Sequence, residues 1–270
     1  MSKKKSPLLS VEDHWQTAMG GAVLGQERVV VRGKDLFTEL DKYSWQQFLL
    51  FMITGRKFDT KRVECLERLL AICINYPDPR IWNNRVAALA GTVGSTATLA
   101  TSAGMAATEA KIFGGQSNLS ASQFIHSALL SVQAGEDLEQ IVRAELKKNR
   151  AVSGYGRPVL KRDERIIHAE RVLREFDIAH GAHAQLACQV EQILMTGRWH
   201  YQMNINGLMA AVTADFGLSA EEYYLWLVNG YNAGIVACFI DAKQKPAGAL
   251  FPLRCTRINY NGAGERVWLK

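Results

Sequence analysis

Residues 154–165 read Gly-Tyr-Gly-Arg-Pro-Val-Leu-Lys-Arg-Asp-Glu-Arg, and this stretch carries more information than any other in the chain. Its two glycines favour a tight turn with a close approach of the backbone to its neighbours. Further cations follow Arg157 within about two helical turns: Lys161, Arg162 and Arg165. Cations beside a glycine loop can bind a carboxylate or a phosphate together with backbone N–H groups. The stretch therefore indicates a site for an anionic small molecule, and the alternative is a basic, solvated start of a helix.

The composition is that of a soluble, well-packed protein. The chain has 270 residues, of which 48% are hydrophobic and 21% charged, enough for one large domain or for a large and a small domain. The net charge of +6 suits acidic metabolites or polyanions. No RNA- or DNA-binding module is recognisable, so we expect no nucleic-acid partner.

The cysteines and the first residues bear on the cellular compartment. Five cysteines occur, none in a Cys-x-x-Cys pair: Cys65, Cys73, Cys188, Cys238 and Cys255. This pattern favours reduced thiols over disulfides or a zinc site, and we expect the first four to be small core residues. The sequence begins Met-Ser-Lys-Lys-Lys with no apolar run after it, so we expect no signal peptide and a cytoplasmic protein.

Helical periodicity dominates the chain. Apolar residues recur at helical spacing in the segments 35–40, 44–54, 61–74, 120–134, 137–148, 162–176, 179–196, 204–216 and 220–242. Ser44 is a good N-cap for its segment, and Gly55 is a good terminator. Residues 29–32 are expected to form one short strand or an extended arm, and residues 1–25 are expected to be irregular. An all-α protein is predicted.

Residues 86–108 contain no charged side chain. The stretch is long enough to span a membrane, but its alanines, glycines, serines and threonines are better suited to close helix packing. We predict one or two helices here, buried in the core or in a subunit interface, and no membrane partner.

The order of short motifs along residues 14–265 resembles the citrate synthase superfamily. The motifs are Val31-Arg32-Gly33-Lys34-Asp35-Leu36, Phe113-Gly114-Gly115-Gln116-Ser117-Asn118, Gly154-Tyr155-Gly156-Arg157, Asn204-Ile205-Asn206-Gly207 and Phe251-Pro252-Leu253-Arg254. The resemblance is closest to the short citryl-CoA lyase-like branch. It implies a largely α-helical homodimer whose active site lies between a large and a small domain. The chemistry that it implies joins or splits a carbon–carbon bond between an acyl-CoA thioester and a keto acid.

The resemblance also implies domains and ligands. The expected parts are an N-terminal arm (1–25), large-domain helices with the dimer interface (26–150), a small domain (151–230) and a C-terminal return to the large domain (231–270). The implied small molecules are a carboxylate and an acyl-CoA, with coenzyme A as part of a substrate and no tightly bound cofactor. The implied protein partner is a second copy of the chain or a paralogue.

The three catalytic positions of the family are substituted. Phe113 and Arg157 stand where the family has histidines, and Asn206 stands where it has an aspartate. A carboxamide cannot accept the α-proton of a thioester, and phenylalanine has no hydrogen-bond donor for the enolate oxygen. Arg157 keeps a donor and a positive charge, but a guanidinium does not readily transfer a proton.

The ligand-binding positions are better preserved. Arg165 and Arg254 match the arginines that hold keto-acid carboxylates in the family, and Lys161 matches a basic residue that meets the coenzyme A phosphate. Two arginines with bidentate geometry could still bind a di- or tricarboxylate. An interdomain salt bridge is the alternative role for these arginines.

Other residues admit a functional and a structural interpretation. Asp163 and Glu164 could replace the missing base or form ion pairs at the start of a helix. His180 and His183 share a helical face, but two ligands are too few for a metal site, so no metal is expected. Cys255, beside Arg254, could be a nucleophile, although no base for it is evident.

Two functions of different class remain open from the sequence. One is a divergent acyltransferase or lyase that uses altered carbon–carbon chemistry. The other is a non-catalytic regulatory or partner protein that binds a carboxylate or coenzyme A on the same scaffold. Exchange of the α-protons of an acyl-CoA into deuterated water separates them, because exchange requires a working base.

Overall fold

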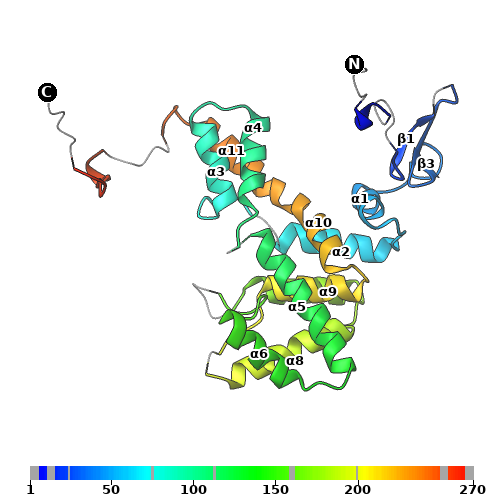
Figure 1. The fold of residues 1–270 in the computed structure, drawn as a ribbon, viewed down its shortest axis with the longest axis vertical. Coiled ribbons are helices and arrows are strands. Elements are labelled where there is room, and N and C mark those ends of the chain that lie inside the picture. Colours follow the sequence, from blue (N-terminus) through cyan, green and yellow to red (C-terminus); the bar gives the residue numbers. More distant parts are fainter. Residues whose placement is uncertain are drawn as a thin grey trace, which may run out of the picture. The chain divides into compact units, whose positions relative to one another are not determined.

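A computed structural model of the protein describes residues 6–10, 16–23, 25–73, 76–111, 114–157, 162–198, 200–249 and 255–264 (Figure 1). The chain forms two compact units. Unit 1 comprises residues 1–73 and 118–226, and unit 2 comprises residues 74–117 and 227–270. Helices dominate both units, which confirms the predicted helical class, and the predicted domain boundaries at residues 25, 150 and 230 stay predictions.

Unit 1 begins with a short 3₁₀ helix, Pro7–Ser10, and a three-stranded antiparallel sheet. The strands are β1 (Gly20–Val23), β2 (Arg28–Val31) and β3 (Lys34–Asp35). Their register pairs Gly20 with Val31 and Val30 with Asp35. The strand predicted at 29–32 is therefore confirmed, whereas the irregular structure predicted for residues 1–25 is wrong where β1 forms.

The helix predicted at 35–40 is also wrong, and the side chain of Asp35 explains why. Its Oδ1 accepts hydrogen bonds from the backbone N–H groups of Phe37 and Thr38, both at 3.0 Å. An aspartate that bonds to the backbone in this way stabilises a turn in competition with a helix.

Helix α1 (Trp45–Thr54) follows the sequence signals at both ends. Ser44 and Gln47 form a capping box, and Gly55 ends the helix in the left-handed conformation with φ 72°. The guanidinium of Arg32 donates to the carbonyls of Met52 and Ile53, at 2.9 and 3.2 Å, which satisfies the last turn of α1. This contact fixes the sheet against the end of the helix.

The remaining helices of unit 1 enclose one apolar core. They are α2 (Thr60–Cys73), α5 (Gly115–Gln133, whose first residues belong to unit 2), α6 (Leu138–Asn149), α7 (Arg165–Glu175), α8 (Ala182–Thr196), α9 (Ile205–Asp215) and α10 (Ala220–Val228, whose last residues belong to unit 2). The largest fully buried side chains of unit 1 are Leu50, Leu66, Leu69, Ile125, Leu173, Leu194, Leu208, Met209, Leu218, Tyr223 and Trp226. Helix α9 packs against α8 and is buried along nearly its whole length. The first turn of α9 is therefore held rigidly, and the candidate site lies there.

Unit 2 contains the charge-free segment 86–108, which forms most of α3 (Trp82–Thr92) and all of α4 (Ala97–Ala107). Both helices pack against α11 (Asn232–Lys243), which follows a 3₁₀ turn, Asn229–Tyr231 (Figure 1). A Cβ on Gly91 would lie 2.7 Å from the carbonyl oxygen of Phe239, and one on Gly104 would lie 2.9 Å from Ile235 Cγ2. The small residues thus permit close packing within the subunit, as predicted for a core position.

Some apolar side chains of unit 2 are exposed. They belong to α3, α4 and the turn between them: Leu89, Val93 and Leu99. Within the described residues, one helical run, Ala220–Lys243, is long and apolar enough to cross a membrane by length and composition, and 44% of its apolar window is buried.

The cysteines differ in burial. Cys65 and Cys238 are core residues as predicted, whereas Cys188 is only half-buried. The side chains of Cys73 and Cys255 lie outside the described residues.

Candidate functional site

The glycine loop at 154–156 is joined to the segment that leads into α9. Tyr155 and Met203 form an isolated antiparallel bridge. The N–H of Gly156 donates to the carbonyl of Gln202 at 2.7 Å, and the N–H of Asn204 donates to the carbonyl of Gly154 at 2.9 Å. Two segments about 50 residues apart thereby become one rigid unit.

Gly154 and Gly207 are required by this close approach. Gly154 has φ 91°, and a Cβ on it would lie 2.8 Å from Gly207 Cα. A Cβ on Gly207 would lie 2.5 Å from the carbonyl oxygen of Gly154. Only two glycines can meet at this distance, so the loop touches the first turn of α9 through its backbone.

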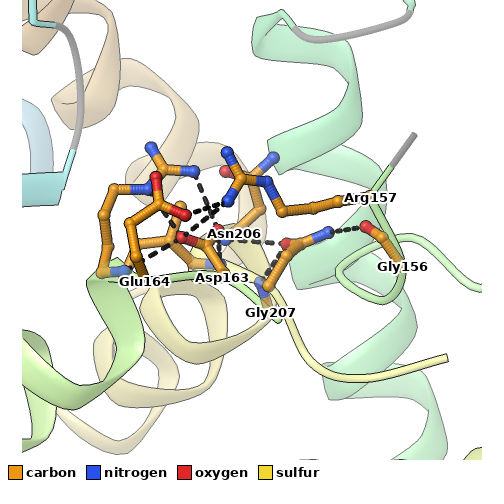
Figure 2. A network of polar contacts seen from close by, with 9 residues as sticks. Gly156, Arg157, Asp163, Glu164, Asn206 and Gly207 are labelled. Carbon is orange, nitrogen blue, oxygen red and sulfur yellow. Dashed lines mark hydrogen bonds and ion pairs between the residues drawn. The ribbon is translucent and has the colours of Figure 1, made fainter. Parts of the chain in front are cut away.

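Asn204 organises the same turn through its side chain. Its Oδ1 accepts from the N–H groups of Asn206 and Gly207, at 3.0 and 3.3 Å, and so caps α9. Its Nδ2 donates to the carbonyl of Gly156 at 2.9 Å (Figure 2). The amide of Asn204 therefore holds both the helix start and the glycine loop.

Asp163 is the central carboxylate of the site. Its side chain is 0% exposed and accepts two hydrogen bonds from the Arg165 guanidinium, Nε at 2.9 Å and Nη2 at 2.8 Å. It also accepts the backbone N–H of Ile205 at 3.0 Å. Burial acts to raise the pKa of Asp163, but the hydrogen bonds and charge of Arg165 and the N–H of Ile205 outweigh it, so the pKa is lowered. Asp163 is an ionised link between the starts of α7 and α9.

Arg157 reaches the same cluster from the glycine loop. Its Nη1 donates to Oε2 of Glu164 and lies 3.6 Å from Oδ1 of Asp163 (Figure 2). The Arg157 side chain is 22% exposed and that of Glu164 is 56% exposed. Hydrogen bonding to the backbone N–H of Glu164 and to Arg157 lowers the pKa of Glu164. The guanidinium of Arg157 is thus held at the surface of the cluster by one buried and one exposed carboxylate.

The structure brings three of the predicted site residues together. Arg157 and Arg165 both contact Asp163, and Asn206 lies in the first turn of α9 beside them (Figure 2). The other three predicted positions, Phe113, Lys161 and Arg254, lie outside the described residues.

The two carboxylates considered as a replacement base both form ion pairs. Asp163 pairs with Arg165 at the start of α7, which confirms its interpretation as a helix-start pair, whereas Glu164 pairs with Arg157 of the glycine loop. A lowered pKa makes each a weaker base than a free carboxylate. In the described part of the site, Asp163 and Glu164 are thus engaged by arginines, and neither carboxylate is poised to accept a proton.

The two histidines make separate contacts. His183 lies in the first turn of α8, but His180 precedes the helix, so the prediction that they share a helical face is wrong because the helix starts only at Ala182. Nε2 of His180 lies 3.1 Å from the carboxylate of Glu170, and Nδ1 of His183 lies 3.0 Å from Asp215. Glu191 accepts the N–H of Met203 at 2.8 Å. Among the described residues no cluster of three histidine, cysteine or carboxylate side chains could hold a metal ion.

Two residues shape the site in ways that the sequence analysis does not predict. Asn204 is the N-cap of α9, and an asparagine directly before an apolar helix is a typical signal for that role. Asp163 joins two helix starts, a role beyond that of a base or a local ion pair. Its hydrogen bond to Ile205, 42 positions away, has no local signal in the sequence.

Comparison with known proteins places the chain in a family. The family model described as "Citrate synthase, C-terminal domain" matches residues 19–248. Among solved structures, citryl-CoA lyase from Hydrogenobacter thermophilus is similar with a TM-score of 0.81 at 19% identity, over 95% of this chain and 98% of that chain. No match is found among curated proteins.

Longer enzymes share the same fold in part. ATP citrate lyase from Methanothrix soehngenii, solved in complex with citrate and coenzyme A, matches with a TM-score of 0.75 at 18% identity, over 98% of this chain and 45% of its own. Citrate synthase from Thermoplasma acidophilum matches with a TM-score of 0.59 at 16% identity, over 84% of this chain and 59% of its own. The helical architecture is thus that of citrate synthase-like proteins, and the predicted resemblance is confirmed.

Proposed function

Because the chain belongs to the citrate synthase family, we propose that it binds a small carboxylate on this scaffold without catalysing the family's carbon–carbon chemistry. The state of the carboxylates carries the proposal. By the resemblance, Asn206 takes the position of the family's base and offers a carboxamide there, and the two nearby carboxylates, Asp163 and Glu164, are engaged by arginines. A ligand carboxylate can bind to Arg157, whose side chain reaches the surface.

Proton exchange tests the absence of catalysis. Acetyl-CoA is incubated with the protein and oxaloacetate in deuterated water, and incorporation of deuterium at the methyl group is followed by mass spectrometry. We expect exchange no faster than in buffer, because losing a general base costs about 10²–10⁴ in rate. Robust exchange would show that another group acts as the base, and Asp163 and Glu164 would be the first to replace.

Calorimetry tests the binding. Citrate, titrated at millimolar concentration, is expected to bind to the wild type and to bind more weakly to Arg157→Gln. The expected loss is about 1.5–3 kcal/mol, the range for hydrogen bonds to charged groups. Arg165 is less suitable for this test because its loss would also leave Asp163 buried and unpaired.

A divergent acyltransferase or lyase is the second candidate function. Its support is the match over nearly the full length of a citryl-CoA lyase, together with Arg157, whose guanidinium could stabilise an oxyanion. A restoring variant addresses it: Phe113→His, Arg157→His and Asn206→Asp are combined in one chain. Activity gained by the triple variant would support lost catalysis on a preserved scaffold, whereas wild-type turnover at about 1–10³ s⁻¹ would support this candidate instead.

The remaining ligands and partners follow the family and belong to the same proposal. Coenzyme A or its thioester is the second ligand, with Lys161 at its phosphate, and Arg254 joins Arg157 and Arg165 at the carboxylate. The protein acts in the cytoplasm as a homodimer or beside an active paralogue. Exposed apolar side chains of the segment 86–108 would contribute to that subunit interface.

A further inference from the structure

We infer that Glu164 is an intramolecular competitor for the anion site at Arg157, so that a ligand carboxylate binds by displacing it. This inference rests on the proposed function and adds a control element to the same site. The carboxylate of Glu164 pairs with the guanidinium of Arg157, the group to which a ligand carboxylate would bind.

The contact geometry separates a fixed carboxylate from a displaceable one. Asp163 is 0% exposed and accepts the hydrogen bonds of Arg165 and Ile205, so it cannot leave without unpairing buried groups. Glu164 is 56% exposed, and Arg157 is its ion-pair partner in the described structure. Its carboxylate can rotate into water at little cost, because an exposed carboxylate is already solvated.

The charge balance explains why the competition matters. Among the described residues of the cluster, two guanidinium groups, those of Arg157 and Arg165, face two carboxylates, those of Asp163 and Glu164. With Glu164 in place the charge of Arg157 is compensated, and this guanidinium has less attraction for a ligand anion. With Glu164 turned away, Arg157 presents one uncompensated positive charge on a side chain that is already 22% exposed.

A double-mutant cycle tests the inference with citrate as the probe. Calorimetric titrations are made on the wild type, Glu164→Gln, Arg157→Gln and the double variant at one pH and one ionic strength. Glu164→Gln is expected to tighten citrate binding about three- to tenfold, since it removes a competing ion pair and a like charge. The gain is expected to vanish when Arg157 is absent, because the competition acts through that guanidinium.

Glu139→Gln is the matched control. Glu139 is 52% exposed and pairs with Arg143, also within unit 1. The substitution changes the net charge by the same amount as Glu164→Gln, so citrate affinity is expected to stay unchanged. Thermal unfolding of each variant verifies that the fold is retained, and Glu164→Ala repeats the test with a different side chain.

The outcomes distinguish this inference from the proposed function. Equal citrate affinity of the wild type and Glu164→Gln would overturn the inference while leaving carboxylate binding intact. An equal gain from Glu139→Gln would also overturn it, because the effect would then be one of net charge. If citrate binds neither to the wild type nor to Glu164→Gln, the inference and the proposed function are both overturned.

Discussion

Replacement of Asp163 by asparagine would test whether the candidate site is also a structural link. Asparagine keeps the size of the side chain but removes its charge. The guanidinium of Arg165 now donates to both carboxylate oxygens, at 2.9 and 2.8 Å, and would keep at most one acceptor, because a carboxamide has one oxygen and one NH₂ group. The N–H of Ile205 would face either that oxygen or the NH₂ group. We expect the first turns of α7 and α9 to separate more easily.

The magnitude follows from the burial of the two partners. Breaking a buried ion pair by removing one partner costs about 3–5 kcal/mol. The Asp163 side chain is 0% exposed, but that of Arg165 is 22% exposed and keeps some access to water. We therefore expect a loss of about 2–4 kcal/mol in the free energy of unfolding, a large part of the roughly 5–15 kcal/mol typical of a native protein.

Urea denaturation followed by circular dichroism measures this loss, with Asp78→Asn as a matched control. Asp78 and Arg80 have the same spacing as Asp163 and Arg165 and form a similar forked contact, with Nε at 2.9 Å and Nη2 at 2.6 Å from Asp78 Oδ2. The Arg80 side chain is 83% exposed, so Asp78→Asn should cost about 1 kcal/mol or less.

The comparison of these two variants can refute the reasoning. If Asp163→Asn costs no more than Asp78→Asn, the buried carboxylate does not hold the two helix starts together. A changed urea dependence (m-value) for Asp163→Asn would instead indicate an altered denatured state or an intermediate, and the free energies would then be compared by hydrogen exchange at the amide of Ile205.

Further predictions concern pH, the glycine loop, a thiol and the assembly. Folding lowers the pKa of Asp163 from its ordinary value of 3.8. The ionised side chain therefore stabilises the fold above pH 3.8, and this stabilisation is lost as the pH falls through the lower pKa of the folded state. Urea midpoints measured between about pH 6 and 3 should decline less for Asp163→Asn than for the wild type. Gly154→Ala should cost at least about 1–2 kcal/mol more than Gly135→Ala in thermal unfolding, because both glycines have φ above 90° but a Cβ at Gly135 meets nothing within 4 Å; equal costs would exclude the close approach as the cause. Burial raises the pKa of Cys65 to about 11, so its alkylation by iodoacetamide at pH 8 should require unfolding, and rapid labelling of the native protein would contradict this. Light scattering at micromolar concentration should give a dimer, and a monomer in which the segment 86–108 exchanges its amide hydrogens rapidly would argue against an interface there.

Much of the fold could be predicted because its signals are local. The capping box of Ser44 and the glycine stop at Gly55 mark the ends of α1 in the sequence itself. The helix predicted at 35–40 is wrong because apolar spacing alone does not take account of Asp35. The side chain of Asp35 accepts backbone hydrogen bonds and stabilises a turn. Strand β1 was missed because Gly20–Val23 has no alternating pattern and gains its order from pairing with β2.

The sequence predicts which cations belong to the site but not which acids they contact. The sequence pointed to Arg157 and Arg165 as cations beside a glycine loop, and both lie in the polar cluster. The resemblance implies a ligand carboxylate for Arg165, which stays a prediction, and the structure shows that its Nε and Nη2 donate to Asp163, two positions away. Spacing alone does not tell which of several nearby acids an arginine will meet, because side-chain direction depends on the backbone at the helix start.

The sequence by itself determined the helical class, most helix ends and the family, since hydrophobic period, caps and motif order are all written along the chain. It also determined that Asn206 cannot act as a carboxylate base, because that follows from the side chain's chemistry. Only the tertiary structure decided that Gly154 meets Gly207 and that Asp163 binds Ile205, contacts between segments some 40–50 residues apart. It likewise decided that the side chain of Asp163 is buried while that of Glu164 is exposed, because the environment of a side chain is set by what packs around it and not by its neighbours in the chain.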